Sequence, residues 1–310
     1  MTQAQVIAEI TAVLVTHNSA AVLARALRSL PPQMPVVVVD NASSDDTCAI
    51  VQTVRPDALL VTLNENQGFG CGMNHGLKRV RTPCALTLNP DAFIAQADIV
   101  RLHAVLRAHD DVGLVAPLLR NEVHEEDLSY HADMFTRERY ARSPLCPVRY
   151  PMPEGPVCAG FLSGAVLLWR AQAFVDTGGF DSHIFLYFED DDLCLRMRAC
   201  GYSTVFVPDA VAVHIGGASS ATSCAMIRFK ERHFAWSHLY IWQKYHARKQ
   251  GRRSIRSGVY CRALYYALGY GVKALGYLPG PSHKRARYVG RLWGTLEYLM
   301  GRRKQTVSDG

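Results

Sequence analysis

Residues 35–43 read PVVVVDNAS, and this stretch decides the fold class. Four consecutive valines that end in an aspartate are typical of a short strand buried on both faces of a parallel sheet. The earlier run at 8–18, AEITAVLVTHN, has the same form, because a strand-like stretch again ends in polar residues. Between the two runs, apolar residues recur at helical spacing over 20–30, and Ser19 stands where a helix cap is expected. This order predicts two parallel strands joined by a right-handed helical crossover.

The alternation of strands and helices continues along the chain. Helices are expected over 45–54, 68–80, 171–179 and 191–201, and strands over 59–64, 84–94, 161–170, 202–208 and 210–217. Residues 120–156 lose this periodicity and gain proline and charge, which predicts a long loop or insertion. The chain is therefore expected to be an α/β protein with a mostly parallel central sheet flanked by helices.

Polar residues follow each of the first four expected strands. Since the carboxyl ends of parallel strands meet at one rim, where open α/β sheets bind their ligands, these residues predict a binding site there. They are Thr16, His17, Asn18, Asp40, Asn41, Ser43, Asn64, Asn66, Asn89 and Asp91. The stretch GFGCGMNHG at 68–76 is spaced G-x-G-x-G and follows the third strand, so it differs from the dinucleotide fingerprint. We expect its backbone to approach a phosphate or sugar closely, without a redox cofactor.

Two residues near strand ends are candidate ligands of a divalent cation. Asp91 follows a strand beside Pro90, and a carboxylate there can bind a hard cation that bridges a diphosphate. The alternative is that Asp91 caps the helix expected near Gln96. His214 also ends an expected strand and precedes two glycines, although a single histidine is more often structural.

The stretch LYFEDDDLCLRMR at 186–198 places four acids side by side, at Glu189–Asp192. Acids in the first turn of a helix interact favourably with its dipole, by about 0.3–1 kcal/mol each, and this accounts for two of the four. Packed carboxylates also raise one another's pKa, which suits a group that must accept a proton. The aromatic residues before them can exclude water and form an apolar wall. The stretch therefore predicts a general base.

Charge is distributed unevenly along the chain. Residues 1–224 contain 16 Lys and Arg against 24 Asp and Glu, a net charge of −8, whereas residues 225–310 contain 18 against 3, a net charge of +15. The basic part interleaves aromatic residues with Lys and Arg, and no apolar run reaches the roughly 20 residues of a membrane span. We expect interfacial helices on an anionic membrane surface. The alternatives are helices that cover the sheet edge and nucleic-acid binding; no recognition module supports the latter, so no nucleic acid is expected.

The N-terminal sequence and the cysteines indicate a compartment. MTQAQVIAEI lacks the basic start and long apolar core of a signal peptide. The nine cysteines include no C-x-x-C pair. Both observations predict a cytoplasmic protein with reduced thiols.

The chain resembles the family 2 glycosyltransferases over roughly residues 10–220. The resemblance is carried, in this order and spacing, by VLVTHN, VVVVDNASSDDT, NENQGFGCGMNHGL, LTLNPD, FLSGAVLLWR, GGFDSHIFLYFEDDDLCLRMRACGY and VAVHIGG. The nearest branch is the rhamnosyltransferase-like enzymes of bacterial surface-polysaccharide assembly. This resemblance implies a GT-A nucleotide-diphospho-sugar transferase fold over residues 1–224, with a basic, membrane-associating helical extension over 225–310. It also implies an inverting, metal-dependent activity.

The resemblance implies roles for individual residues. Asn89-Pro90-Asp91 stands in the place of the D-x-D metal motif, whose first aspartate is Asn89 here, so Asp91 and His214 would hold Mg²⁺ or Mn²⁺. Asp190 would be the catalytic base, and Glu189 would position the substrate or tune the base. The donor-binding residues would be Thr16, Asn18, Asp40, Asn41, Ser43, Asn66, Gly68, Asn74 and Asn89.

These implications predict a glycosyltransferase bound peripherally to the inner face of the plasma membrane. Its expected donor is a nucleotide sugar, foremost dTDP-L-rhamnose, and its acceptor a polyprenyl-diphosphate-linked saccharide; a UDP-hexose donor is the alternative. The sequence carries no signal for the oligomeric state. A nucleotidyltransferase is a rival class, but the Gly-rich basic loop that it needs after the first strand is missing from THNSAAVLARAL. A catalytically inactive, membrane-bound sugar-nucleotide-binding protein is the second rival.

Overall fold

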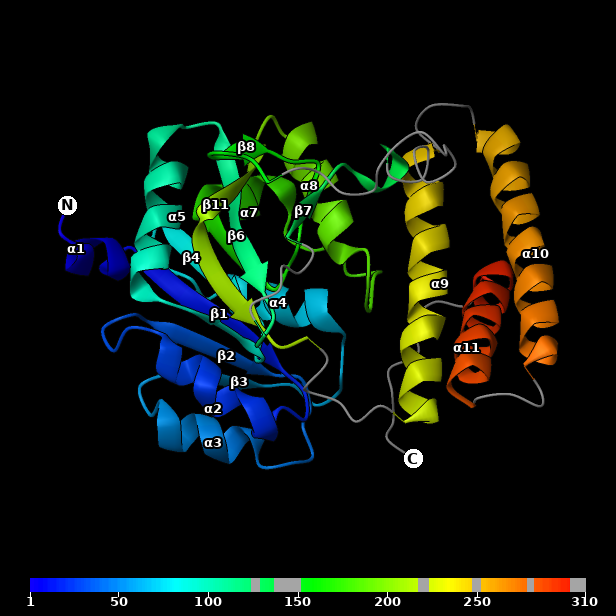
Figure 1. The fold of residues 1–310 in the computed structure, drawn as a ribbon, viewed down its shortest axis with the longest axis horizontal. Coiled ribbons are helices and arrows are strands. Elements are labelled where there is room, and N and C mark those ends of the chain that lie inside the picture. Colours follow the sequence, from blue (N-terminus) through cyan, green and yellow to red (C-terminus); the bar gives the residue numbers. More distant parts are fainter. Residues whose placement is uncertain (124–128, 137–151, 217–222, 247–251, 278–281, 302–310) are drawn as a thin grey trace. The chain divides into compact units, whose positions relative to one another are not determined.

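The computed structural model describes residues 1–123, 129–136, 152–216, 223–246, 252–277 and 282–301. Most of the expected loop at 120–156 lies outside these residues. By its internal contacts the chain divides into two units (Figure 1). The sheet unit comprises residues 1–181 and 190–219, and the helical unit comprises residues 182–189 and 220–310. A short segment from the middle of the chain therefore belongs with the C-terminal helices.

The sheet unit is built around a nine-stranded sheet that is parallel over its first half and mixed beyond it. The parallel half has the order β3-β2-β1-β4, from β1 (Ile10–Thr16), β2 (Val36–Asp40), β3 (Leu59–Thr62) and β4 (Cys84–Leu88). In the mixed half, β10 (Val166–Arg170) runs antiparallel between β4 and β6 (Val112–Arg120), and β11 (Ser203–His214) is parallel to β6. β5 (Ala92–Ile94) and β8 (Val157–Cys158) pair antiparallel with β11. A separate pair joins β7 (Tyr130–His131) and β9 (Phe161–Leu162).

The strands over residues 84–94 and 202–217 differ from the sequence prediction. The run 84–94 is two strands, because the chain leaves β4 after Leu88 and joins β11 as β5. Pro90 lies at the break and has no N–H for a ladder. The runs 202–208 and 210–217 form the single strand β11, whose register shifts between Val207 and Val211. Pro208 lies within this shift, where a bulge tolerates a proline.

Helices cover both faces of the sheet. One face carries α1 (Gln3–Ala8), α2 (Ala20–Ser29), α3 (Thr47–Val54) and α5 (Gln96–Ala108), and the other carries α4 (Phe69–Leu77), α7 (Ala171–Thr177) and α8 (Glu189–Ala199). Successive residues of β1 alternate between the two cores: Leu14 packs in one, and Val13 and Val15 pack in the other. Burial on both faces explains why every position of β1 and β2 is buried. Ser19 precedes α2 as expected, but its hydroxyl bonds to the backbone of His17 instead of capping the helix.

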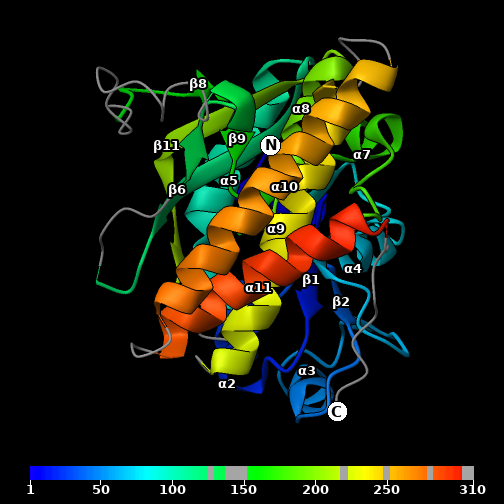
Figure 2. The same ribbon diagram turned by 90° about the vertical axis from the view of Figure 1, so that its right-hand side faces the viewer.

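The helical unit contains α9 (Cys224–His246), α10 (Arg252–Gly276) and α11 (Ser282–Leu299). Helix α11 packs against both other helices and crosses them obliquely (Figure 2). Two glycines of α11 permit this approach, since a Cβ at Gly290 or Gly294 would overlap backbone carbonyls of α9. Glu297 also accepts two hydrogen bonds of 2.6 Å from the guanidinium of Arg232. Within the described residues, no helix combines the length and the apolar character needed to cross a membrane.

Candidate active site

The carboxyl ends of β1 and β2 bring together the first group of predicted site residues. Thr16 lies opposite Asp40 in the ladder, and its Oγ1 is 3.4 Å from Asp40 Oδ1. The other carboxylate oxygen of Asp40 accepts the N–H of Ser43 at 3.0 Å. Ser43 Oγ in turn accepts the N–H of Asn18 at 2.9 Å. Four predicted donor-binding residues therefore form one hydrogen-bonded cluster on the rim.

The loops that carry this cluster contain strained backbone. Asn18 and Ala42 have φ angles of 50° and 58°, in the left-handed region that side chains other than glycine rarely adopt. Each such residue costs on the order of 1–3 kcal/mol and persists only where its surroundings hold it. The side chain of Asn18 provides part of that support, since its Oδ1 accepts the N–H of Ser44 at 2.8 Å. Strain of this kind is concentrated at binding sites, which agrees with a ligand site at this rim.

A second group joins the loop after β2 to the start of α4. Asn41 Nδ2 donates to Asn66 Oδ1 at 3.0 Å and to the carbonyl oxygen of Gly68 at 3.1 Å. Asn41 Oδ1 accepts the N–H of Gln67 at 2.9 Å. Gly68 precedes α4 with a φ of 84°, which glycine adopts at little cost. Asn41, Asn66 and Gly68 are thus brought together, as their predicted common role requires.

Asn74 is placed differently from the other predicted donor-binding residues. Its Nδ2 donates to the carbonyl oxygen of Phe180 and its Oδ1 accepts the N–H of Phe180, both at 2.8 Å. The edge of the Phe69 ring also meets the Phe180 ring, with centroids 5.9 Å apart. The structure therefore shows Asn74 as a clamp between α4 and the chain after α7. A donor contact by Asn74 stays a prediction.

The predicted metal ligands meet where β5 pairs with β11. Ala92 lies opposite His214, and the N–H of Ile215 donates to the carbonyl oxygen of Asp91 at 3.0 Å. This pairing places His214 Nε2 3.5 Å from Asp91 Oδ1. The residue that caps α5 is Ala95, so the alternative that Asp91 is a helix cap is wrong.

The residues at this junction fit a divalent cation shared with a substrate. A carboxylate and an imidazole this close can ligate Mg²⁺ or Mn²⁺ when diphosphate oxygens and water fill the other positions. Asn89, two residues before Asp91, has a buried Oδ1 without a hydrogen-bond partner, so a third oxygen is available nearby. In the part of the chain that the structure describes, no three His, Cys, Asp or Glu side chains form a metal site by themselves. The pair therefore resembles an open site more than a closed structural one.

Asp190 lies near the start of α8 in a setting that favours its neutral form. Its Oδ2 accepts the N–H of Gly164 at 2.8 Å, whereas its Oδ1 is buried without a hydrogen-bond partner. The side chain as a whole is half-buried, but protein surrounds the carboxyl group. Burial and, to a smaller extent, the charge of Asp191 raise the pKa of Asp190 to about 7, against the effect of the Gly164 hydrogen bond. A carboxylate with such a pKa can accept a proton near neutral pH.

The other acids of 189–192 have separate surroundings. Asp192 is fully buried and accepts a 2.7 Å hydrogen bond from Arg196, which also donates to the carbonyl oxygen of Thr177. Asp192 thus holds Arg196 within α8, and the bond from Arg196 to Thr177 connects α8 to the end of α7, which indicates a structural role for Asp192. Asp191 is 5% exposed and Glu189 is 8% exposed. A role for Glu189 in positioning the substrate stays a prediction.

Gly164 is a site residue that the sequence did not single out. A Cβ on Gly164 would overlap Asp190 Oδ1, so only glycine lets the carboxylate reach the backbone N–H. The adjacent residue, Ala165, accepts the N–H of Asn89 at 2.9 Å through its carbonyl oxygen. The segment 164–165 therefore connects the predicted base to the N-P-D motif. A glycine inside the apolar run FLSGAVLLWR was the available signal, since glycine in a strand often marks a close approach.

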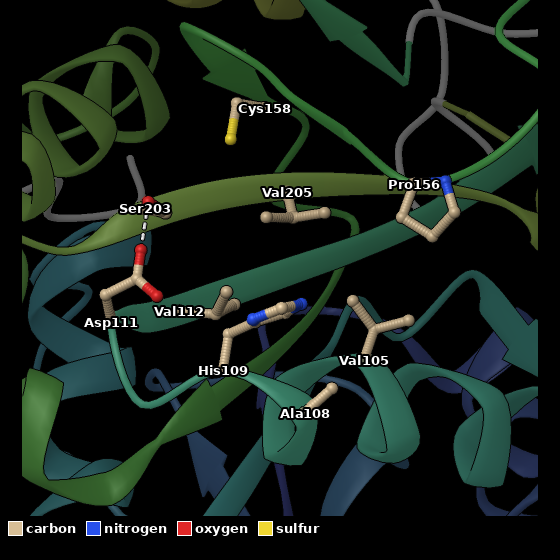
Figure 3. A pocket seen from close by; sticks show the side chains of 9 residues that line it. All are labelled: Val105, Ala108, His109, Asp111, Val112, Pro156, Cys158, Ser203 and Val205. Carbon is tan, nitrogen blue, oxygen red and sulfur yellow. Dashed lines mark hydrogen bonds between the residues drawn. The ribbon is translucent and has the colours of Figure 1, made fainter.

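A separate hollow lies at the opposite ends of the strands. It has a volume of about 450 Å³ and is bordered by α5, β8 and the amino ends of β6 and β11 (Figure 3). Asp111 and Ser203 are hydrogen-bonded at its edge, with an Oδ2 to Oγ distance of 2.7 Å. None of the predicted site residues lines it. The candidate active site is therefore the polar rim and not this hollow.

Comparisons with known proteins indicate the class of enzyme to which this chain is similar. The family model for glycosyl transferase family 2 matches residues 11–159. An N-acetylglucosaminyl-diphospho-decaprenol L-rhamnosyltransferase of Mycobacterium tuberculosis is 28% identical over 232 residues, which cover 65% of this chain and 74% of the relative. The rhamnosyltransferase WbbL of Escherichia coli is 35% identical over 159 residues, 40% of this chain and 58% of WbbL. Among solved structures, the mannosyltransferase PcManGT of Pyrobaculum calidifontis, in complex with GDP-Man and Mn²⁺, is similar with a TM-score of 0.56 and 17% sequence identity. The aligned residues cover 94% of this chain and 87% of the PcManGT chain.

The fold and the rim together define a glycosyltransferase of the GT-A type. The mixed sheet flanked by helices agrees with the architecture of the solved structure, and at 17% identity that likeness concerns the fold. The family suggested by the sequence motifs is the one that the family model and the two relatives also indicate. Over residues 11–159 this chain matches the model of glycosyl transferase family 2, and its likeness to the two named relatives agrees with that family.

Proposed function

We propose that this enzyme transfers L-rhamnose from dTDP-L-rhamnose to a polyprenyl-diphosphate-linked saccharide, with inversion at the anomeric carbon. The observation that carries the transfer chemistry is Asp190, whose Oδ1 is free of hydrogen bonds while Oδ2 is fixed by Gly164. The choice of sugar and acceptor is supported by the Mycobacterium tuberculosis relative, whose name gives L-rhamnose and a decaprenol-linked diphosphate sugar. The Escherichia coli relative is also named a rhamnosyltransferase.

The transfer is a single displacement. The oxygen of the acceptor hydroxyl attacks the anomeric carbon while the bond between that carbon and the diphosphate oxygen breaks. The hydroxyl proton passes to Oδ1 of Asp190, and the nucleoside diphosphate leaves with the bonding electron pair. Because the base and the leaving group stand on opposite faces of the sugar, the configuration inverts. General-base assistance of this kind contributes about 10²–10⁴-fold.

The rim residues bind the donor in this proposal. The carboxylate of Asp40 accepts the ring N–H of thymine or uracil, and Thr16, Asn18 and Ser43 keep that carboxylate and its loop in place. Asp91 and His214 would hold Mg²⁺ or Mn²⁺ beside the diphosphate. When bound, the cation supplies positive charge that offsets the charge gained by the leaving group.

The helical unit supports an acceptor that lies at a membrane. Helix α10 presents apolar residues at spacings of three and four, and Leu264, Leu268, Val272 and Leu275 are 54%, 73%, 70% and 66% exposed. An exposed apolar stripe on a helix in a part of the chain with a net charge of +15 fits the surface of an anionic bilayer. We infer a peripheral position on the inner face of the plasma membrane.

A donor panel tests the proposal. The purified chain is offered dTDP-L-rhamnose, UDP-glucose, UDP-galactose and UDP-N-acetylglucosamine, each with Mg²⁺ or Mn²⁺ and a polyprenyl-diphosphate-linked N-acetylglucosamine. We expect release of dTDP and rhamnosylated lipid only with dTDP-L-rhamnose. Turnover confined to a UDP-sugar would replace the donor, because Asp40 can pair equally with uracil and thymine. Binding of a donor without turnover of any would favour the catalytically inactive alternative.

A further inference from the structure

One face of α9 contacts the segment directly before the proposed base. The contacts extend along about three turns of the helix, from Phe229 to Tyr240. Each pairs a residue of α9 with one of 183–188: Phe229 and His233 with Phe185, Phe234 with Tyr187 and Phe188, Ser237 with Leu186, His238 with Phe188, and Tyr240 with His183. This is why residues 182–189 belong to the helical unit.

One polar contact in this row is a hydrogen bond from a buried donor. Ser237 is fully buried, and its Oγ donates to the carbonyl oxygen of Leu186 at 2.9 Å. The bond helps to fix the backbone at Leu186, because without Ser237 the carbonyl group loses this donor.

The aromatic contacts support a strained backbone. Tyr187 and Phe188 have φ angles of 67° and 66°, so two consecutive residues with large side chains are left-handed. Such a pair persists only where the surrounding structure holds it. Phe234 lies against both, with ring centroids 5.8 Å from Tyr187 and 5.0 Å from Phe188. Phe234 and Ser237 therefore contact three consecutive residues between them: Phe234 packs on Tyr187 and Phe188, and Ser237 donates a hydrogen bond to Leu186.

The left-handed pair determines where α8 begins. The backbone is left-handed at Tyr187 and Phe188, and the right-handed helix α8 begins at the next residue, Glu189. Asp190, the next residue, is the first to belong to the sheet unit again. A change in the backbone at 186–188 is thus passed directly to Asp190 through two peptide bonds.

We propose that Ser237 and Phe234 of α9 are positioning residues for the general base. They keep Leu186–Phe188 in the left-handed turn that sets the position of Asp190 for proton transfer. The inference rests on the proposed function, because it takes Asp190 to be the base. The proposal gives the basic helices two roles. They bind the membrane in which the acceptor lies, and α9 also holds the segment that precedes Asp190.

The test compares two buried hydroxyl groups in the full-length protein. Ser237→Ala removes the bond to Leu186, and Thr295→Val removes an equivalent bond from Thr295 Oγ1 to the carbonyl oxygen of Arg291, 2.8 Å long, within α11. Both residues are fully buried in the helical unit. We expect Ser237→Ala to lower kcat by about ten- to a hundredfold, as a misplacement near 1 Å does, with the donor Kd within about twofold of wild type. Thr295→Val should leave kcat within about twofold while lowering the melting temperature comparably.

Two further readouts separate positioning from loss of stability. The acid limb of the kcat profile should move to lower pH in Ser237→Ala, because a loosened segment lets water reach Asp190. Phe234→Leu should lower kcat as Ser237→Ala does, and Phe234→Tyr should retain it, since the ring is kept. Unchanged kcat in Ser237→Ala and Phe234→Leu would overturn the inference and leave the proposed function intact. An equal loss of kcat in Thr295→Val would also overturn the inference. Full activity of Asp190→Asn would instead contradict the proposed function, because Asp190 would then not be the base.

Discussion

The surroundings of one carboxyl group decide at which pH the proposed base is ionised. Asp190 keeps one oxygen on a backbone N–H and the other without a partner. Among its neighbours, Asp191 raises its pKa, and burial raises the pKa of Cys194 to about 12, so that this thiol stays neutral. The pKa of about 7 for Asp190 therefore depends mainly on burial.

Activity should follow the ionisation of this group. We expect turnover to rise with pH through an acid limb near 7, since Asp190 must be deprotonated to accept a proton. Asp190→Asn should lower turnover by about 10²–10⁴-fold and leave donor and metal binding unchanged. Steady-state kinetics from pH 5 to 9 and calorimetric titration of the donor measure both effects. Retention of more than about a hundredth of wild-type turnover would contradict the base assignment.

Stability should depend on pH through the same group. Its pKa is raised on folding, so the folded chain holds the proton more tightly than the unfolded chain. The resulting stabilisation is complete below the ordinary pKa near 4 and is lost as pH rises through about 7. Asp190→Asn cannot titrate and so does not lose this stabilisation. The melting temperature of the variant minus that of wild type should therefore increase from pH 5 to pH 8, when both are measured without metal or donor. A difference that stays constant with pH would show that Asp190 does not titrate in this range.

Gly164 offers a second test at the scale of one residue. Gly164→Ala places a Cβ against Asp190 Oδ1 and should displace the carboxylate, with a loss of turnover of about tenfold or more. Gly155→Ala is the matched control, because a Cβ there has open space around it. Turnover of both variants with the same donor makes the comparison. Equal activity would mean that the carboxylate does not depend on the Gly164 N–H.

The sequence could name Asp190 but not its surroundings. The cluster FEDDD stands out by composition, whereas the bond to Gly164 joins residues 26 positions apart. The left-handed angles of Tyr187 and Phe188 leave no trace in residue type, because aromatic residues normally avoid this region. Asp192 and Arg196, at helical spacing four, were readable as a pair in principle, since both lie on one face of α8.

At the scale of elements, one antiparallel pairing creates the predicted metal site. β5 has three residues and brings Asp91 to His214 only because it pairs with the end of β11. Strands β1, β2 and β4 were predictable, since their apolar runs are buried on both faces. The position of β5 was not, because the run 84–94 gives no sign that its last residues leave for another strand.

Removal of either ligand should weaken metal-dependent donor binding. Asp91→Ala and His214→Ala should each raise the Kd for the nucleoside diphosphate with Mn²⁺ by about tenfold or more, whereas EDTA should abolish the difference from wild type. Asp209→Ala and His109→Ala are controls, since both residues are exposed and lie outside the site. Calorimetric titration decides the matter, and unchanged affinity in both site variants would refute a metal at this junction.

At the scale of the whole chain, charge and exposed apolar surface are concentrated in the helices that follow the sheet unit. The charge asymmetry was visible in the sequence, and so was the mixture of aromatic and basic residues. The membership of residues 182–189 in the helical unit was not. Their partners on α9 lie about 40–60 positions further on, and such pairings have no local pattern.

Membrane binding should depend on the exposed face of α10. Leu268→Gln combined with Val272→Gln should weaken binding to anionic vesicles by about tenfold or more, because each of these exposed apolar side chains would contribute roughly 1.5–3 kcal/mol when the membrane buries it. Val175→Gln is the control, an equally exposed apolar residue on α7. Co-sedimentation with phosphatidylglycerol vesicles at low and high salt measures the binding. Unaltered binding by the double variant would assign the stripe to packing instead.

The interleaving of the two units also imposes an order on synthesis. Residues 182–189 leave the ribosome on the order of seconds before the turns of α9 that support them, at typical elongation rates. A nascent chain that already contains every rim residue thus still lacks the partner of its strained turn. The same division constrains chimeric proteins built from two relatives. A C-terminal part taken from one relative lacks the segment equivalent to residues 182–189 with which it packs. A workable exchange has three crossovers, one on each side of 182–189 and one after residue 219.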